Sequence, residues 1–167
     1  MKIPKWVWIV SAVVPVSFFL LPQKSSPGVY SFGDPTNPYR DPGRLIPAFA
    51  DRVELLFQRL RARGFQPFLV QGYRTPEQAA DNEARGTGIA RSQHILGAAA
   101  DIHDAGKSAA FPRAVGEEAK RLGLTWGGDF STRYDWAHVQ AAPGKLDGKM
   151  WAMSSDQRAR FVKELLG

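Results

Sequence analysis

The chain has 167 residues, of which 44% are hydrophobic and 23% are charged, and this ordinary globular composition excludes a disordered or fibrous protein. It contains no cysteine, which excludes disulfides, thiolate metal sites and cysteine nucleophiles. The net charge of +6 suits an anionic cell wall, a membrane surface or a nucleic acid about equally well.

The N-terminal residues follow the pattern of an export segment. Lys2 and Lys5 precede an uncharged apolar stretch over residues 6–22. Because positive residues ahead of an apolar run stay in the cytoplasm, we expect the rest of the chain to lie outside the inner membrane, on the periplasmic or extracytoplasmic side. No Ala-x-Ala cleavage site follows, so residues 1–22 are predicted to be an uncleaved signal anchor or transmembrane segment. Cleavage would instead give a secreted protein, and a buried core helix is the remaining alternative.

A linker and a single folded domain are expected after this segment. Residues 23–43 are rich in proline, glycine, serine and asparagine, which is typical of a linker with turns. Residues 44–167 then form the domain. Its first helix is indicated by apolar residues spaced three or four apart and by a glycine that ends it, namely Ile46, Phe49, Val53, Leu56, Leu60 and then Gly64.

The rest of the domain mixes helices and strands. Strands are predicted within residues 65–73, 97–103 and 134–141, and helices within 75–86 and 111–122 and from Ser154 or Ser155 onward. The second helix has a capping box, with Thr75 at the N-cap and Gln78 three residues later. Because helices and strands do not alternate regularly, the pattern favours an α+β fold with a small antiparallel sheet flanked by helices.

A metal site in this chain must use imidazole and carboxylate ligands. Only three histidines are present, His94, His103 and His138. A zinc enzyme commonly has three protein ligands and one open position, and His94, Asp101 and His138 are a candidate set. Gly97 and the alanines beside it allow the backbone to come close to a ligand.

The segment "SQHILGAAAD", residues 92–101, resembles the Ser-x-His-x-x-Gly-x-Ala-x-Asp signature of the zinc peptidases that include D-alanyl-D-alanine carboxypeptidases and phage-lysin L-alanyl-D-glutamate endopeptidases. All five specified positions match. Downstream, "WGGDFSTRYDWAHVQ" resembles the second block of the family, in which an acid stands three residues before a histidine. Upstream, "QGYRTPEQ" resembles its Gly-Tyr-Arg-Thr segment.

The resemblance implies a role for each matched residue. His94, Asp101 and His138 would bind one zinc ion per chain, in a central cleft. Asp135 would be the general base, and Arg74 would face the carbonyl of the bond that is cut and stabilise its negative charge. Ser92 would orient a ligand or bind the substrate.

Two further residues compete for places in this site. His103 follows Asp101 on the same strand face, so it is an alternative ligand, a residue just behind the ligands or an exposed side chain. Asp129, in a Gly-Gly-Asp turn, either supports the site or only makes the turn. The tryptophans Trp126, Trp136 and Trp151 are expected in the core rather than along a cleft.

The resemblance implies a monomeric, membrane-tethered zinc metallopeptidase that cuts peptidoglycan stem peptides, with residues 6–22 in the membrane. We expect an L-alanyl-D-glutamate endopeptidase because the base position holds aspartate, as in the lysin-type branch. A D-alanyl-D-alanine carboxypeptidase is the first alternative. A non-catalytic wall-binding module would lack the base or a ligand, and neither is missing. A nucleic-acid partner is not expected, because no basic helix, stacking motif or Cys/His finger is present.

Overall fold

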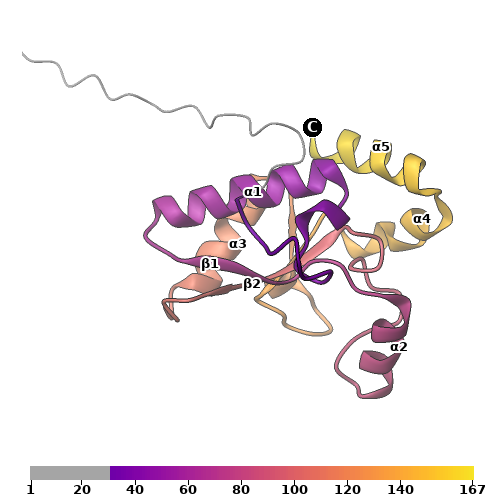
Figure 1. Cartoon of the computed structure of the whole chain (residues 1–167), viewed down its shortest axis with the longest axis horizontal. Coiled ribbons are helices and arrows are strands. Elements are labelled where there is room, and N and C mark those ends of the chain that lie inside the picture. Colours follow the sequence, from indigo (N-terminus) through magenta and orange to yellow (C-terminus); the bar gives the residue numbers. More distant parts are fainter. Residues whose placement is uncertain (1–30) are drawn as a thin grey trace, which may run out of the picture.

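The computed structural model describes residues 31–167, so the expected membrane segment, residues 1–22, lies outside the described residues. Within the described part, no helix is long and apolar enough to cross a bilayer. The described part has the predicted α+β architecture, with helices packed on a small antiparallel sheet (Figure 1). The division into membrane segment, linker and domain stays a prediction.

Helices and strands follow one another in a mixed order. The helices are α1 (Pro47–Ala62), α2 (Pro76–Ala84), α3 (Phe111–Arg121), α4 (Asp147–Ala152) and α5 (Ser155–Leu166), with short 3-10 turns η1 (Pro42–Arg44), η2 (Gly127–Asp129) and η3 (Gly144–Leu146). The strands are β1 (Pro67–Gln71), β2 (Ala99–Asp104), β3 (Thr125–Trp126) and β4 (His138–Gln140).

The sheet separates the core from the face that carries the polar residues. Its strands are antiparallel in the order β1-β2-β4-β3. Asp101 of β2 is paired with His138 of β4, and Ala100 with Val139. Because side chains alternate across a strand, Ala100, Ile102 and Val139 face the core while Asp101 and His138 face the opposite side.

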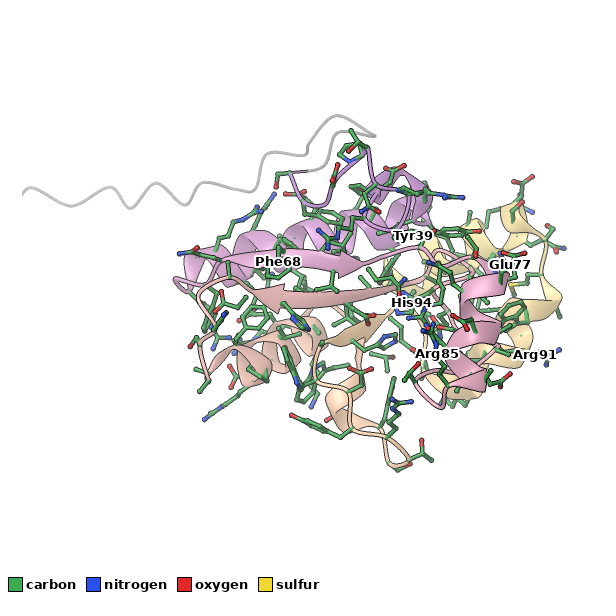
Figure 2. The ribbon with its side chains drawn as sticks, turned by 60° about the horizontal axis from the view of Figure 1, so that its bottom comes forward. Tyr39, Phe68, Glu77, Arg85, Arg91 and His94 are labelled. Carbon is green, nitrogen blue, oxygen red and sulfur yellow. The ribbon has the colours of Figure 1, made fainter. Side chains whose placement is uncertain are left out.

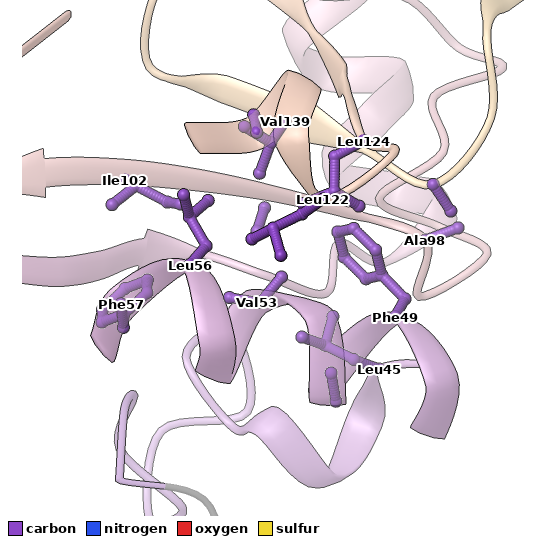
Figure 3. Packing of buried hydrophobic residues seen from close by; sticks show 14 of the residues in the cluster. Leu45, Phe49, Val53, Leu56, Phe57, Ala98, Ile102, Leu122, Leu124 and Val139 are labelled. Carbon is purple, nitrogen blue, oxygen red and sulfur yellow. The ribbon is translucent and has the colours of Figure 1, made fainter. Parts of the chain in front are cut away.

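The core face of the sheet is covered by α1, which also contacts α3 and α5. Phe49, Val53 and Leu56 of α1 are fully buried, and Figure 3 shows them in one cluster with Ile102 and Val139 of the sheet. Burial of each such side chain stabilises the fold by roughly 1.5–3 kcal/mol. The three-four spacing predicted this helix correctly, and Gly64 follows it with a φ of +87°.

The structure has the capping box predicted for α2 and a second one, which the sequence analysis did not predict, at the start of α5. Thr75 accepts a hydrogen bond from the Gln78 amide, and the Gln78 side chain accepts one from the Thr75 amide. Ser154 and Gln157 do the same for α5. The first cap matters for the site, because Arg74 directly precedes Thr75 and is therefore held at the start of α2.

The prediction for residues 134–141 was wrong in extent, since only His138–Gln140 forms a strand. Before it the chain turns, with the His138 amide donating to the carbonyl oxygen of Asp135 and the Asp135 amide donating to that of Gly127. The sequence also did not predict β3 or α4. β3 has two residues and α4 has six, which is too short to show a hydrophobic period.

The described part of the expected linker lies against the domain. Residues 31–43 form turns as predicted. However, the amide and hydroxyl of Ser31 both donate to the Glu54 carboxylate of α1, at 2.7 and 2.5 Å, and Phe32 is buried beside Phe57. The buried Glu54 therefore fixes the chain to α1 ahead of residue 44.

Gly97 joins the loop that carries His94 to the start of α1. Its φ is +67°, and its carbonyl oxygen accepts a hydrogen bond from the Ile46 amide at 2.8 Å. A Cβ atom at this position would lie 2.6 Å from the backbone oxygen of Arg44. Both the backbone conformation and the close approach require glycine.

We expect Gly97→Ala to lower the free energy of unfolding by about 2–4 kcal/mol, because the new methyl group adds left-handed strain and a backbone clash. Gly148→Ala is the matched control: a Cβ atom there would have nothing within 4 Å, so its effect should stay below about 1 kcal/mol. Urea unfolding followed by circular dichroism measures both. Equal effects of the two substitutions would contradict this account of Gly97.

Candidate metal centre

Three ligand-type side chains meet on the polar face of the sheet. Asp101 and His138 are neighbours on β2 and β4, and His94 comes from the turn before β2. One ligand atom from each lies within 4.8 Å of the others. Figure 2 shows His94 at the end of the sheet beside α2. The structure therefore brings together the three residues that the sequence motifs selected.

The imidazole of His94 has a defined orientation. This side chain is 1% exposed, and its Nδ1 lies 2.7 Å from the carbonyl oxygen of Gly72. A carbonyl oxygen can only accept, so Nδ1 carries the proton and donates. The Nε2 atom then has a free lone pair, and it lies 3.3 Å from Oδ1 of Asp101.

The imidazole of His138 is fixed from its other side. Its Nε2 lies 2.9 Å from Oε1 of Gln140, and the Gln140 amide nitrogen donates to the carbonyl oxygen of Ala142. The latter bond orients the Gln140 amide, so Nε2 of His138 donates to Oε1. Its Nδ1 therefore faces inward, 3.0 Å from Oδ1 of Asp101 and 3.3 Å from Nε2 of His94.

Two imidazole nitrogens and one carboxylate oxygen thus converge. The nitrogens are acceptors when their rings are neutral, and the oxygen is an acceptor when the carboxylate is ionised. Three acceptors at this spacing repel one another unless a proton or a metal cation lies among them. Outer N–H groups that donate to fixed acceptors are also the usual surroundings of metal-binding histidines. The donor set of two nitrogens and one oxygen fits zinc.

The acid–base properties of the cluster agree with this geometry. Burial alone would raise the pKa of Asp101, but the charge of His94 and hydrogen bonds from both imidazoles hold that pKa far below its usual range. Burial alone would lower the pKa of His138, but the hydrogen bond and charge of Asp101 raise it above its ordinary value. A positive charge is therefore favoured at the centre of the cluster.

Arg74 lies beside these residues and is nearly buried, with 9% of its surface exposed. Its Nε and Nη2 atoms donate to Oε1 of Gln71, and Nη2 lies 3.9 Å from Oδ2 of Asp101. Burial lowers the pKa of its guanidinium, while the charges of Asp101 and Asp135 act in the opposite direction. The guanidinium is thus held in place by the Gln71 amide, and the charges of two nearby acids favour its protonated form.

All six residues selected from the sequence line one cleft of about 180 Å³: Arg74, Ser92, His94, Asp101, Asp135 and His138. Asp135 lies near enough to Arg74 and His138 to act on the pKa of each. The hydroxyl of Ser92 accepts a hydrogen bond from the His94 amide at 3.3 Å, so it also stabilises the turn that carries this ligand.

The two competing residues lie elsewhere. His103 is exposed and stacks on Trp136, with ring centroids 5.0 Å apart, and it is not in the metal-type cluster. Asp129 forms an ion pair with Lys120 at 2.8 Å on the surface. Trp126, Trp136 and Trp151 are partly buried against the core, as expected.

The sequence analysis did not select the polar residues that surround the three ligand-type side chains. Gln140 follows His138 by two positions, so strand alternation alone would have placed it on the same face. Gln93 donates to the Ala142 carbonyl oxygen at 2.8 Å and to Asp147 at 2.7 Å. Asp147 also lines the cleft, and burial raises its pKa. No motif marked Gln93 or Asp147, because their partners lie about 50 residues away.

A family model described as D-alanyl-D-alanine carboxypeptidase matches residues 85–141. A crystal structure of the L-Ala D-Glu endopeptidase ChiX of Serratia marcescens is similar at 22% identity, covering 59% of this chain and 81% of that one, with a TM-score of 0.49. The LdcB LD-carboxypeptidase is similar at 18% identity, covering 72% of this chain and 68% of that one, with a TM-score of 0.44. The comparison with curated proteins gave no match.

The site and the family match together define the class: the protein is a peptidase. More particularly, residues 85–141 match the model of the D-alanyl-D-alanine carboxypeptidases, which confirms the resemblance that the sequence motifs indicated. The matched segment contains His94, Asp101, Asp135 and His138, whereas Arg74 precedes it.

We expect Gln140→Met to weaken zinc binding by roughly 10–100-fold, because His138 loses the acceptor that keeps Nδ1 facing the cluster. Gln140→Glu retains an acceptor and should bind zinc more tightly than Gln140→Met. Zinc affinity is measured by competition with a chromophoric chelator, with circular dichroism as the check on folding. Gln66→Met, at the position before β1, controls for the substitution itself. Unchanged affinity in Gln140→Met would show that Gln140 does not orient the ligand.

Proposed function

We propose that this protein is a zinc peptidase that hydrolyses peptidoglycan stem peptides, and that its target is the bond between L-alanine and D-glutamate. One observation supports this most directly: all six residues selected by the family motifs line the same cleft. The export pattern of residues 1–22 supports a location outside the inner membrane, where this substrate lies. We propose that the domain acts there as an anchored monomer.

His94, Asp101 and His138 would hold one zinc ion through Nε2, a carboxylate oxygen and Nδ1. The chemistry that such an ion supplies when bound is Lewis acidity, which polarises a carbonyl group and makes water a better nucleophile. Asp101 contributes negative charge that offsets part of the charge of the ion. The hydrogen bonds from His94 to Gly72 and from His138 to Gln140 keep both lone pairs directed at one point.

We assign the proton transfers to Asp135. The Asp135 amide donates to the carbonyl oxygen of Gly127. A Cβ atom on Gly127 would lie 2.4 Å from the backbone carbonyl oxygen of Asp135, so this turn requires glycine. A carboxylate on the cleft wall can take a proton from the attacking water and pass it to the leaving amine. Both transfers are needed for peptide hydrolysis, because an amide nitrogen leaves only as an amine.

We assign the stabilisation of the developing oxyanion to Arg74. A guanidinium stays protonated at neutral pH, and the two hydrogen bonds to Gln71 hold it still before the substrate arrives. A fixed charge that needs no reorganisation during the reaction is the effective form of electrostatic catalysis. Ser92 supports the His94 turn and lies within reach of a bound peptide in the same cleft.

D-Alanyl-D-alanine carboxypeptidase activity is the second candidate, and the description of the matching family model favours it. Aspartate rather than glutamate at position 135 favours the endopeptidase. A non-catalytic wall-binding module is less well supported, because the base and every ligand are present in one cleft.

Digestion of purified peptidoglycan by the full-length chain distinguishes these functions. We expect new L-alanine carboxyl and D-glutamate amino termini by mass spectrometry, and we expect a zinc chelator to abolish them. Release of free D-alanine would identify the carboxypeptidase instead. Binding to the wall without any chelator-sensitive product would support the non-catalytic module.

Asp135→Asn should reduce kcat by about 10²–10⁴-fold, because an amide cannot accept the proton from water. Zinc content should stay near one ion per chain, since Asp135 is not in the ligand cluster. Asp129→Asn is the matched control, because Asp129 pairs with Lys120 on the surface and should leave turnover unchanged. Loss of zinc from Asp135→Asn would mean that this carboxylate is a ligand rather than the base.

A further inference from the structure

The cleft has two arginines, and they differ in what surrounds them. Arg74 is nearly buried and engaged by Gln71 and Asp101. Arg133 also lines the cleft but is exposed, and its guanidinium contacts the carbonyl oxygen of Gly86 at 3.5 Å. Within residues 31–167 Arg133 forms no ion pair with an acid.

The acids of the cleft have other partners or other tasks. Asp101 is engaged by both imidazoles, and Asp147 accepts a hydrogen bond from Gln93. Asp135 lines the wall where the proposed proton transfers occur. The charge of Arg133 is therefore available to an anionic group of a bound substrate.

The position of Arg133 indicates which part of the substrate it meets. It stands two residues before Asp135, on the same loop, and reaches toward Gly86 on the facing loop, so it borders the cleft on the side of the proposed base. Asp135 must lie close to the nitrogen of the leaving amine, because it delivers a proton there. The α-carboxyl carbon of the same residue is only two bonds from that nitrogen.

We propose that Arg133 binds the free α-carboxylate of the D-amino acid that supplies the leaving amine. This inference rests on the proposed function and holds for either candidate substrate. In the L-alanyl-D-glutamate linkage the chain continues through the γ-carboxyl group, so the α-carboxylate of D-glutamate is free. In D-alanyl-D-alanine the terminal carboxylate is free. Arginine suits this task because its planar fork binds a carboxylate through two hydrogen bonds.

Arg133 is then a specificity-determining residue rather than part of the proton-transfer machinery. A peptide whose leaving residue carries an α-amide in place of the α-carboxylate keeps the same scissile bond but loses the anion. The protein should prefer the acid over the amide, and that preference should depend on position 133. Arg74 does not replace it, because its guanidinium, held by Gln71, has the proposed task of stabilising the oxyanion.

Paired substrates test the assignment: L-alanyl-D-glutamyl peptides against their D-isoglutaminyl forms, and D-alanyl-D-alanine peptides against their C-terminal amides. With zinc-loaded full-length protein, we expect Arg133→Gln to lower kcat/KM on the acid by about 10–100-fold, mainly through KM, since a charge-assisted hydrogen bond is lost. The effect on the amide should be much smaller, so the acid-to-amide ratio falls toward one. Arg133→Lys should retain part of the preference, because it keeps the charge without the fork.

Arg160→Gln, an exposed arginine of α5 that does not line the cleft, should leave the acid-to-amide ratio unchanged. If Arg133→Gln lowers turnover of acid and amide equally, or changes neither, the assignment is overturned while the peptidase stands. If the wild-type protein cleaves none of the four substrates, the proposed function itself is overturned, and the assignment falls with it.

Discussion

The site depends on Asp101 lying between two imidazoles whose outer nitrogens are already engaged. His94 donates to the Gly72 carbonyl oxygen and His138 donates to Gln140, so the inner nitrogens cannot turn away from the carboxylate. Without a cation or a proton, three acceptors would face one another at 3.0 to 3.3 Å. This constraint explains why the cluster suits a metal ion. Each outer hydrogen bond ends on the backbone or on a buried amide, so both rings keep their orientation.

The residues that fix the three ligand-type side chains come from separate elements of the fold. β2 and β4 set the Asp101–His138 spacing through their register, because paired residues of antiparallel strands share one face. Gly97 lets the His94 turn approach the start of α1, where a side chain would clash. The Gln93 side chain ties this turn to Ala142, beyond the end of β4, and so links the sequence segments of both histidines. The hydrophobic core lies on the other side of the sheet, so the polar face is free to carry chemistry.

The cleft divides the proposed tasks among side chains with different surroundings. Arg74 is nearly buried and held by Gln71, which suits a fixed charge beside a reacting carbonyl. Asp135 stands on a turn stabilised by Gly127, beside the ligands but outside their cluster. Arg133 is exposed and free of acids among the described residues, which suits a group that meets the substrate on entry. The side chains to which we assign different roles therefore also differ in how deeply they are buried and in which groups they pair with.

The sequence alone determined the α+β class, the amphipathic α1 and the capping box of α2, and its motifs selected six residues that line one cleft, because periodicity, caps and motifs are local patterns. It overestimated the strand around residue 138 and missed β3 and α4, since such short elements are stabilised by their neighbours rather than by a pattern of their own. Only the tertiary structure decided that His103 stacks on Trp136 outside the cluster, that Asp129 pairs with Lys120, and that Gln140, Gln93 and Asp147 lie around the cleft. These outcomes depend on contacts between segments far apart in the chain, and such contacts exist only once the sheet has brought those segments together.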